Sequence, residues 1–392
     1  MIITWDVSSL HGWGVYGLNL ALHWARDPDL KLACGRELRP EYLSVDPLSA
    51  QVLAPFVHDS AELVKSFAGN AGQAAQSSGP VLLGLDDAAA ATRAAHEVAL
   101  TGKPTLGVAF LVAARLDALA VTRLDTMDLV IAGCAWNEQL IRANGVERVT
   151  TVLQGIDPSL FHPAPRLGLL GDRFLVFSGG KLERRKGQDL ALAAFKVFAE
   201  RHEDALLVTA WHSPWPDLAR TVDRSGVASP VQFLSNGAVD AVGWAVANGI
   251  PARQVLDLGL VPNRSMPQLL REMDVALFPN RCEPGTNLVA MEAMACGVPT
   301  ILSANTGHLD LIEEGNSYPL TRQTPLTDHE GGIDGVPGWG ESDVEEMVAA
   351  LEAAYADRAA ARARGLKGAE TLAKLTWAAT AAQMKQEIMA RI

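Results

Sequence analysis

The chain has 392 residues, a formal net charge of −12 and a hydrophobic content of 48%. This length suits two domains of about 150 to 200 residues each. The negative charge argues against broad nucleic-acid binding and gives no attraction to an anionic membrane. No apolar run approaches the roughly 20 residues of a membrane span, and the N-terminus lacks the basic region of a signal peptide. We therefore expect a cytoplasmic protein with no transmembrane segment.

The first residues predict a strand, a loop and a helix, at Ile2–Trp5, Asp6–Gly14 and Val15–Ala25. Three glycines in this stretch spell the dinucleotide pattern Gly-x-Gly-x-x-Gly, at positions 12, 14 and 17. In that pattern the first glycine turns directly off the strand, whereas several residues intervene here. A nicotinamide-binding loop and a merely tight turn are both open interpretations of this stretch.

The next hundred residues alternate helical segments with short apolar strands, which is typical of an α/β domain. The predicted strands include Val81–Leu85, Thr105–Phe110 and Leu129–Ala132. Prolines at 163 and 165 and glycines at 168 and 171 then interrupt the pattern. These breakers predict a linker, with a second domain beginning at residue 166.

The second domain repeats the α/β pattern. Its predicted strands are Phe174–Ser178, Leu206–Thr209, Val231–Leu234, Val255–Gly259, Asp274–Pro279 and Thr300–Leu302. A basic loop joins the first of these strands to a helix predicted at Gln188–Arg201. The loop carries Lys181, Arg184, Arg185 and Lys186, and we expect the two arginines to be more solvated than the two lysines.

The densest chemistry lies between Arg281 and Pro299, where a loop leads from a strand into a helix predicted at Thr286–Cys296. Thr286 or Asn287 is expected to cap this helix, and Gly285 would let a ligand approach the backbone. Free N–H groups and the positive end of the helix dipole favour phosphate binding at such a point.

Two carboxylates frame this phosphate-binding point, Glu283 in the loop and Glu292 about two turns into the helix. Carboxylates accept hydrogen bonds from hydroxyl groups. Anion donors between two hydroxyl acceptors suit a molecule with a phosphate in the middle and polyols at both ends. The pattern therefore favours a nucleotide sugar as ligand, although each glutamate would also be explained as an ordinary helix-start or solvated residue.

The segment resembles the two-glutamate motif of retaining family 4 glycosyltransferases. Eight residues separate Glu283 from Glu292, one more than in the commoner family pattern. The basic loop is similar to the family sequence Gly-Arg-Leu, three residues, Lys-Gly, with Lys181 in place of the arginine. Residues 128–163 are similar to the end of the family's first domain, and Trp377 to the start of its last helix.

This resemblance implies an α/β fold with two Rossmann-like domains whose parallel sheets face each other across a cleft, the GT-B fold. The first domain would span residues 1–165 and bind the acceptor. The second would span residues 166–376 and bind the nucleotide sugar. A helix at about 377–392 would pack back on the first domain.

The resemblance also implies transfer of a hexosyl-type unit, with retention, from a nucleoside diphosphate sugar to an acceptor hydroxyl. No cofactor is expected besides this donor substrate. No metal is expected either, because the chain offers no credible paired-aspartate site. Glu283, Lys186 and Lys181 would be catalytic. The donor-binding residues would be Gly12, Gly14, Lys181, Lys186, Gly285, Thr286, Asn287, Leu288 and Glu292. The strand around residues 105–112 carries neither the histidine nor the acid that many family members place near the sugar, so the acceptor stays unidentified.

Two other functions remain open. One is a different sugar-nucleotide enzyme or a nicotinamide-dependent enzyme, which the glycine pattern near residue 12 favours. The other is an inactive, glycosyltransferase-like binding module. The four cysteines, at 34, 134, 282 and 296, have no metal-ligand spacing and are interpreted as reduced thiols.

Overall fold

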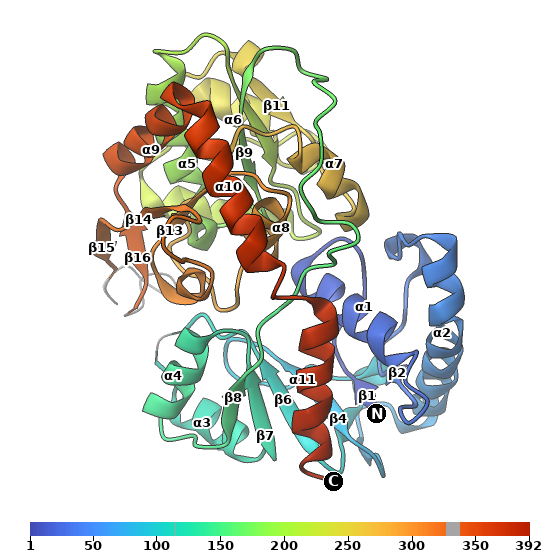
Figure 1. Ribbon diagram of the computed structural model, residues 1–392. Coiled ribbons are helices and arrows are strands. Elements are labelled where there is room, and N and C mark those ends of the chain that lie inside the picture. The colour runs from blue at the N-terminus through green and yellow to red at the C-terminus, as the bar shows by residue number, and fades with distance from the viewer. Residues whose placement is uncertain (114, 327–337) are drawn as a thin grey trace. The chain divides into compact units, whose positions relative to one another are not determined.

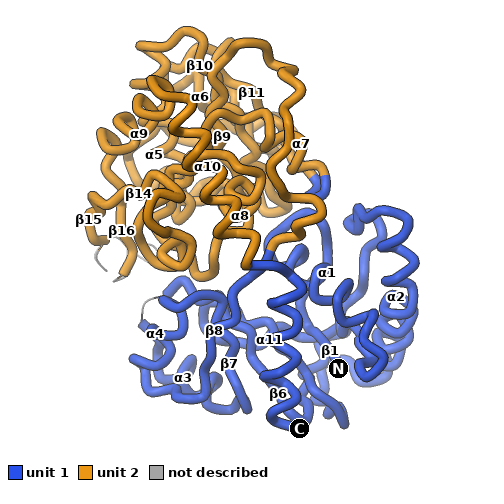
Figure 2. The backbone as a smooth tube through the Cα atoms, in the orientation of Figure 1, with its two compact units in different colours: residues 1–155, 262–264, 375–392 blue, residues 156–261, 265–374 orange. Residues whose placement is uncertain are grey.

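The computed structural model describes residues 1–113, 115–326 and 338–392 and divides the chain into two compact units (Figures 1 and 2). Unit 1 comprises residues 1–155, 262–264 and 375–392, and unit 2 comprises residues 156–261 and 265–374. The chain thus first passes from unit 1 to unit 2 between Gly155 and Ile156, ten residues before the domain boundary that the prolines predicted. Each unit is described below by itself.

Unit 1 is built on a six-stranded sheet with the order β2-β1-β4-β6-β7-β8, in which all neighbouring strands are parallel. Its strands are β1 (Ile2–Ile3), β2 (Ala33–Cys34), β4 (Val81–Leu85), β6 (Thr105–Ala109), β7 (Leu129–Ala132) and β8 (Val149–Thr151). A small parallel pair joins β3 (Ala74–Gln76) to β5 (Ala99–Thr101). The helices are α1 (Gly12–Trp24), α2 (Pro47–Phe67), α3 (Ala118–Asp125), α4 (Ala135–Ala143) and α11 (Trp377–Met389).

The connections in unit 1 place a topological switch between β1 and β4, since the chain leaves β1 for β2 on one side and later returns to β4 on the other. Ligands of open parallel sheets bind outside the carboxyl ends of the strands at such a point. The C-terminal helix α11 packs on α1 within this unit, where the Trp24 indole N–H donates to the carbonyl of Ala381 at 3.1 Å.

Unit 2 has a second six-stranded parallel sheet, with the order β11-β10-β9-β12-β13-β14. Its strands are β9 (Phe174–Gly179), β10 (Ala205–Ala210), β11 (Val255–Asp257), β12 (Val275–Phe278), β13 (Thr300–Ser303) and β14 (Tyr318–Leu320). Its helices are α5 (Gln188–Ala199), α6 (Ala241–Ala247), α7 (Met266–Leu270), α8 (Leu288–Ala295), α9 (Val344–Ala356) and α10 (Arg358–Leu372). An antiparallel pair joins β15 (Gln323–Pro325) to β16 (Gly340–Ser342).

The prediction of two α/β domains with parallel sheets is confirmed. Every residue of β9, β12 and β13 is buried, because helices cover both faces of a parallel sheet. The predicted strand Val231–Leu234 is wrong: only Phe233 makes a bridge, to Val239. The backbone of Leu234 instead closes a turn with Ala238, so this apolar run forms a local loop.

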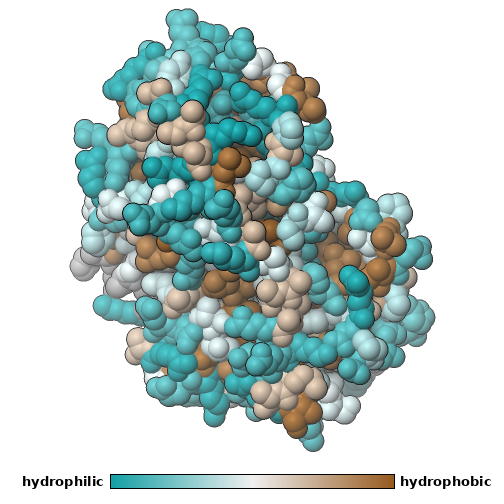
Figure 3. Space-filling model, viewed as in Figure 1, coloured by the Kyte–Doolittle hydropathy of each residue, from teal (hydrophilic) through white to brown (hydrophobic). Residues whose placement is uncertain are grey.

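The surface carries mainly hydrophilic residues on the face shown in Figure 3, with hydrophobic residues scattered among them. In the described parts of the chain, no helix has both the length and the apolar character that crossing a membrane requires.

Candidate active site

The basic loop of unit 2 leaves β9 through Gly179 and Gly180 and ends in a short 3-10 turn, Arg184–Lys186. Gly187 follows with φ +70°, and a Cβ there would lie 2.1 Å from the carbonyl oxygen of Pro279. Only glycine fits this left-handed conformation and close approach without strain. The loop is thereby held against the segment that leaves β12.

Glu283 lies in that segment, and three donors reach its Oε1 atom. Lys186 Nζ lies 2.5 Å away, Arg185 Nη1 lies 3.1 Å away, and Asn280 donates from its side-chain amide. The Glu283 side chain is only 4% exposed. An ionised carboxylate is stable in such a place only because cations and donors replace its lost hydration.

The protonation states follow from this arrangement. Burial by itself would raise the pKa of Glu283, but the charges of Lys186 and Arg185 outweigh burial and hold that pKa at about 2. Burial lowers the pKa of Lys186, while the neighbouring Glu283 acts in the opposite direction. At neutral pH the site therefore presents an ionised carboxylate in contact with two cations.

The two lysines of the loop lie in different surroundings. Lys181 is 35% exposed in its side chain and pairs with Glu183 at 3.2 Å, whereas Lys186 is 12% exposed and contacts Glu283. Glu183 also pairs with Arg185. These three cations and two carboxylates alternate in space, and their formal charges sum to +3 − 2 = +1.

The prediction that Arg184 and Arg185 are the more solvated residues of the loop is wrong. Arg184 is 2% exposed, and the Arg185 side chain is 12% exposed. Arg185 donates to the Cys282 carbonyl at 2.9 Å besides its contact with Glu283. Sequence spacing could not reveal this, because the direction of a loop side chain depends on the segment that packs over it.

A third loop fixes the backbone of Glu283. The Glu283 N–H donates to Thr306 Oγ1 at 2.7 Å, and the N–H of Gly307 donates to the Glu283 carbonyl at 2.9 Å. A Cβ on Gly307 would lie 1.7 Å from the carbonyl oxygen of Gly285. The loop after β13 thus requires glycine where it supports the loop after β12.

The start of α8 differs from its prediction in length and in capping. The helix begins at Leu288, and Asn287 is the N-cap residue, with φ +60° and no side-chain capping bond. Its amide is used elsewhere: Nδ2 meets His308 Nε2 at 3.0 Å, and Oδ1 accepts from Lys186 Nζ at 3.5 Å. The side chain of Asn287 therefore leaves the N–H groups of the first turn uncapped, and it links the helix start to Lys186.

His308 is fully buried behind Asn287. Burial lowers the pKa of His308 to about 4, so its imidazole is neutral at physiological pH. Its Nδ1 lies 3.2 Å from the Ser303 carbonyl, which can only accept. The proton must therefore be on Nδ1, and Nε2 accepts from the Asn287 amide.

The remaining predicted donor residues of unit 2 lie around this helix start, and all of them are buried. They are Gly285, Thr286, Leu288 and Glu292. Glu292 is 5% exposed and lies about one turn into α8, rather than two, because the helix begins two residues later than predicted.

A buried ion pair that the sequence did not predict supports the whole arrangement. Both guanidinium ends of Arg281 bind Asp189 of α5, at 2.8 and 2.7 Å, and neither side chain is exposed. Arg281 also donates to Glu341 of β16 at 2.8 Å and to the Arg184 carbonyl at 2.8 Å. Its only sequence signal is its position two residues before Glu283.

Parts of the chain are similar to known proteins. Residues 262–384 match the family model described as "Family 4 Glycosyltransferase in conflict systems". The D-inositol 3-phosphate glycosyltransferase 1 of Catenulispora acidiphila is 30% identical over 202 residues, 49% of this chain and 45% of that protein. Over these parts of its length the chain is similar to family 4 glycosyltransferases.

Two further proteins extend the comparison. A GDP-mannose-dependent phosphatidylinositol monomannoside mannosyltransferase of Mycolicibacterium smegmatis is 27% identical over 229 residues, 55% of this chain and 49% of that protein. The solved sucrose-phosphate synthase of Thermosynechococcus elongatus superposes with a TM-score of 0.65 at 19% identity, over 99% of this chain and 98% of that one. The similarity to the solved synthase shows that this chain has the two-domain GT-B fold. The chain spans about half the length of the curated relatives that it matches.

Gly12 and Gly14 lie in unit 1 and form part of a helix, not a loop as predicted, because α1 already begins at Gly12. The cap is His11, whose Nδ1 accepts from the N–H of Gly14 at 3.1 Å. A Cβ on Gly14 would lie 2.0 Å from Ser8 Oγ, whereas a Cβ on Gly12 would meet no atom within 4 Å. Internal packing thus explains Gly14 but not Gly12.

The cysteines give no sign of catalysis or metal binding. All four are buried thiols outside any disulfide bond, and burial raises the pKa of Cys34 and of Cys296 to about 12. Within residues 1–113, 115–326 and 338–392, no group of three His, Cys, Asp or Glu residues is arranged to hold a metal ion.

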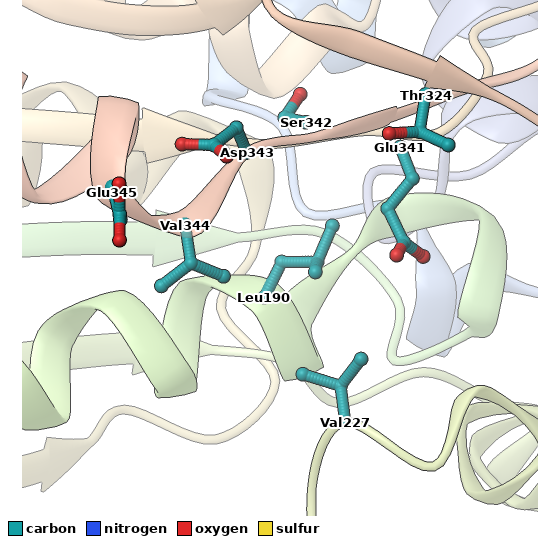
Figure 4. A pocket seen from close by; sticks show the side chains of 8 residues that line it. All are labelled: Leu190, Val227, Thr324, Glu341, Ser342, Asp343, Val344 and Glu345. Carbon is teal, nitrogen blue, oxygen red and sulfur yellow. The ribbon is translucent and has the colours of Figure 1, made fainter.

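A pocket of about 320 Å³ lies elsewhere in unit 2 (Figure 4). It is lined from α5, from β15 and β16, from the start of α9 and from Val227. Glu341, which binds Arg281, is one of its lining residues, but none of the predicted site residues is.

Proposed function

We propose that the protein is a retaining glycosyltransferase that moves a hexosyl-type unit from a nucleoside diphosphate sugar to an acceptor hydroxyl. The observation that carries this proposal is the buried contact of Glu283 with Lys186 and Arg185, at the carboxyl ends of β9 and β12. The two-glutamate motif and the similarity to family 4 glycosyltransferases support the reaction class. A cytoplasmic location is part of the proposal, because nucleotide sugars are formed from cytoplasmic nucleoside triphosphates.

The leaving group defines the role of the cations. A nucleoside diphosphate gains negative charge as the glycosidic bond breaks, and preorganised cations stabilise charge that develops in the transition state. We assign this role to Lys186, with Lys181 at the more exposed edge of the loop. The positive end of the α8 dipole, at the helix start around Thr286, Asn287 and Leu288, would attract the same diphosphate.

The two glutamates would bind different parts of the donor. Glu283 would orient the hydroxyls of the transferred sugar and oppose the positive charge that builds at the anomeric carbon. Glu292, about one turn into α8, would accept hydrogen bonds from the ribose hydroxyls. Gly285 and, from unit 1, Gly12 and Gly14 complete the proposed donor-binding set. Of these, the packing of Gly14 against Ser8 makes its assignment the weakest.

The reaction is expected to need no metal, because Lys186 and the helix start supply the charge that a divalent cation would otherwise provide. Turnover should therefore persist after treatment with a chelator and desalting. A strict requirement for Mg²⁺ or Mn²⁺, shown by loss on chelation and recovery on addition, would contradict this part of the proposal.

The test is release of nucleoside diphosphate from a panel of uridine-, guanosine- and adenosine-diphosphate hexoses. Glu283→Gln serves as the inactive variant, and Lys65→Ala, an exposed residue of unit 1, serves as the control. NMR of the product would show whether the anomeric configuration is retained. Inversion would contradict retention. An absorbance change with a nicotinamide cofactor and no release would favour a nicotinamide enzyme, and binding without turnover would favour an inactive module.

A further inference from the structure

Unit 1 contains a continuous group of aromatic side chains, which we call the aromatic platform: Trp5, Trp13, Tyr16 and Phe110. Trp13 lies 4.8 Å from Phe110, ring centre to ring centre, with the rings nearly perpendicular. Trp5 lies 5.5 Å from Trp13 and 5.8 Å from Tyr16. Tyr16 also contacts Phe110 at 5.6 Å. These distances are typical of aromatic pairs that stabilise one another.

The members of the platform differ in exposure. Trp5 and Tyr16 are buried, at 3% and 1% exposure, whereas Trp13 and Phe110 are only partly covered. Trp5 and Tyr16 therefore form the buried part of the platform, and Trp13 and Phe110 form its accessible part.

The platform lies where an open parallel sheet binds its ligands. Phe110 directly follows β6, and Trp5 follows β1, the strand at the topological switch with β4. Trp13 is the second residue of α1, the helix that follows β1. The carboxyl ends of these parallel strands lie at one edge of the sheet, which is the expected side for a ligand.

Neighbouring glycines hold the platform rigid. A Cβ on Gly133 would lie 2.1 Å from the Phe110 ring, so this ring packs directly on the backbone after β7. A Cβ on Gly17 would lie 2.8 Å from the indole nitrogen of Trp5. Side chains locked in this way bind a flat partner without a further loss of conformational freedom.

The charged residues at the same edge do not favour an anion. Asp6 follows Trp5, and Asp86 and Asp87 follow β4, and all three are exposed. Two cations lie beside them: Arg36 is paired with Asp6 at 2.6 Å, and Arg123 donates to the Ala88 carbonyl at 2.9 Å. Arg115, farther along the loop after β6, already makes an interaction of its own. A phosphorylated ligand would therefore meet like charges here rather than free cations.

We propose that Trp13 and Phe110 bind the sugar ring of the acceptor by stacking, and that this acceptor is an uncharged carbohydrate. One face of a pyranose ring presents C–H bonds that pack on aromatic rings, while its hydroxyls can donate to the surrounding aspartates. This inference rests on the proposed function, because it assigns the acceptor of that reaction. It separates this protein from a relative such as the D-inositol 3-phosphate glycosyltransferase, whose name specifies a phosphorylated acceptor.

The first experiment measures binding without turnover. Saturation-transfer NMR on the full chain would use methyl glucoside, methyl mannoside, methyl galactoside and maltose as neutral probes, and glucose 6-phosphate and inositol phosphate as anionic ones. We expect at least one neutral probe to bind. Trp13→Leu should lower the affinity for that probe by about tenfold or more, which is the typical contribution of one good contact to a ligand. Trp13→Phe should retain most of the binding, because it keeps an aromatic face.

The controls separate stacking from general folding effects. Because Trp13 also packs on Trp5 and Phe110, circular dichroism must first show that Trp13→Leu is folded. A stacking role then predicts a loss of sugar binding that Trp13→Phe largely restores. Tyr42→Ala removes a partly exposed aromatic residue of unit 1 outside the platform and should have no effect. Preferential binding of the anionic probes, no binding of any neutral probe, or equal binding by Trp13→Leu would each overturn the inference.

A second measurement distinguishes this inference from the proposed function. Calorimetry with nucleoside diphosphates should give the same affinity for Trp13→Leu and the unmodified protein, and a lower affinity for Lys186→Ala. If nucleotide sugars are turned over and Trp13→Leu keeps an unchanged KM for the acceptor, only the inference fails. If neutral sugars bind at Trp13 but no nucleotide sugar is turned over, only the proposed function fails.

Discussion

Each unit begins with a strand, a loop and a helix, but the two loops carry residues of different chemical character. In unit 1, β1 leads to α1 through a loop of small and aromatic residues, and a single charged residue of that loop, Asp6, lies on the surface. In unit 2, β9 leads to α5 through a loop with four basic residues and one acid. Both loops depend on close glycine contacts, at Gly14 and at Gly187.

The difference concerns how each loop is held in place. In unit 2 the loop is fixed by ionic contacts with Glu283 and with the Arg281 network, so its structure and its proposed chemistry use the same charges. In unit 1 the loop is held by aromatic packing, by hydrogen bonds from Ser9 to the Tyr42 carbonyl and by one surface ion pair, Asp6–Arg36, and Trp13 remains accessible. A parallel α/β unit thus provides only the edge of the sheet, and the loop residues decide whether that edge suits a diphosphate or an uncharged ring.

The largest effect is expected where unit 2 depends on a buried charge. Arg281→Met should lower the free energy of unfolding by about 3 to 5 kcal/mol, because Asp189 is left buried without its cation. Urea unfolding followed by circular dichroism would measure this. Lys65→Met, which breaks the exposed pair of unit 1 with Glu62, should cost no more than about 1 kcal/mol. Equal losses would show that the two units do not differ in this respect.

The next effect concerns catalysis. Glu283→Gln should lower turnover by about 10² to 10³, the loss seen when one transition-state contact is removed, with little change in nucleoside diphosphate affinity. Glu292→Gln should instead weaken nucleotide binding, by about tenfold, and leave saturated turnover less affected. Turnover assays and calorimetry on both variants test this. A collapsed turnover with normal affinity in the Glu292 variant alone would mean that the roles are reversed.

The free energy of unfolding should depend on pH through His308, which contacts Asn287 at the start of α8 in unit 2. The pKa of His308 is lowered to about 4, so between pH 6.5 and 4 the unfolded chain takes up a proton that the folded protein does not. Stability should therefore fall with decreasing pH across this window, by up to about 3 kcal/mol. Glu283 acts in the same direction only below its ordinary pKa of 4.5, because its folded pKa is about 2.

Unfolding measured at several pH values would detect this slope. His308→Gln keeps hydrogen-bonding groups but cannot titrate, so its stability should vary less between pH 6.5 and 4. An identical slope in the variant and the unmodified protein would assign the pH effect to other groups.

A smaller effect is expected within the basic loop itself. Lys186→Ala should weaken nucleoside diphosphate binding by about tenfold, and Lys181→Ala by less, because Lys181 is the more exposed of the two. Lys186→Arg should do less harm than Lys186→Ala, since it keeps the charge. Unchanged affinity of Lys186→Ala in calorimetry would refute the assignment of the diphosphate to this loop.

The smallest effect tests the glycines of unit 1. Gly12→Ala adds a Cβ with no neighbour within 4 Å at the start of a helix, so the free energy of unfolding should rise by about 0.5 kcal/mol. Gly14→Ala should destabilise the protein instead, because of the clash with Ser8. If Gly12→Ala lowers kcat/KM without lowering stability, the added methyl group reports on a bound donor. Unchanged kinetics would remove Gly12 from the proposed site.

Local sequence patterns predicted most of the fold. Strands such as Val81–Leu85 and Leu129–Ala132 were predicted with their observed bounds, because a short apolar run between breakers has few alternatives. Errors arose where a neighbouring segment decides the outcome. Val231–Leu234 has a strand-like composition, but it turns back on itself through Ala238.

The sequence by itself determined which residues could form the site, because Glu283, Glu292 and the lysine loop lie in short, recognisable patterns. The tertiary structure decided which of them meet. Lys186 reaches Glu283 across 97 residues of chain, Arg185 joins them although its predicted environment was solvent, and Asn287 turns from the helix cap to His308. These contacts depend on the register of β9, β12 and β13 and on close approaches at Gly187 and Gly307, and no local pattern encodes a distance between segments that far apart.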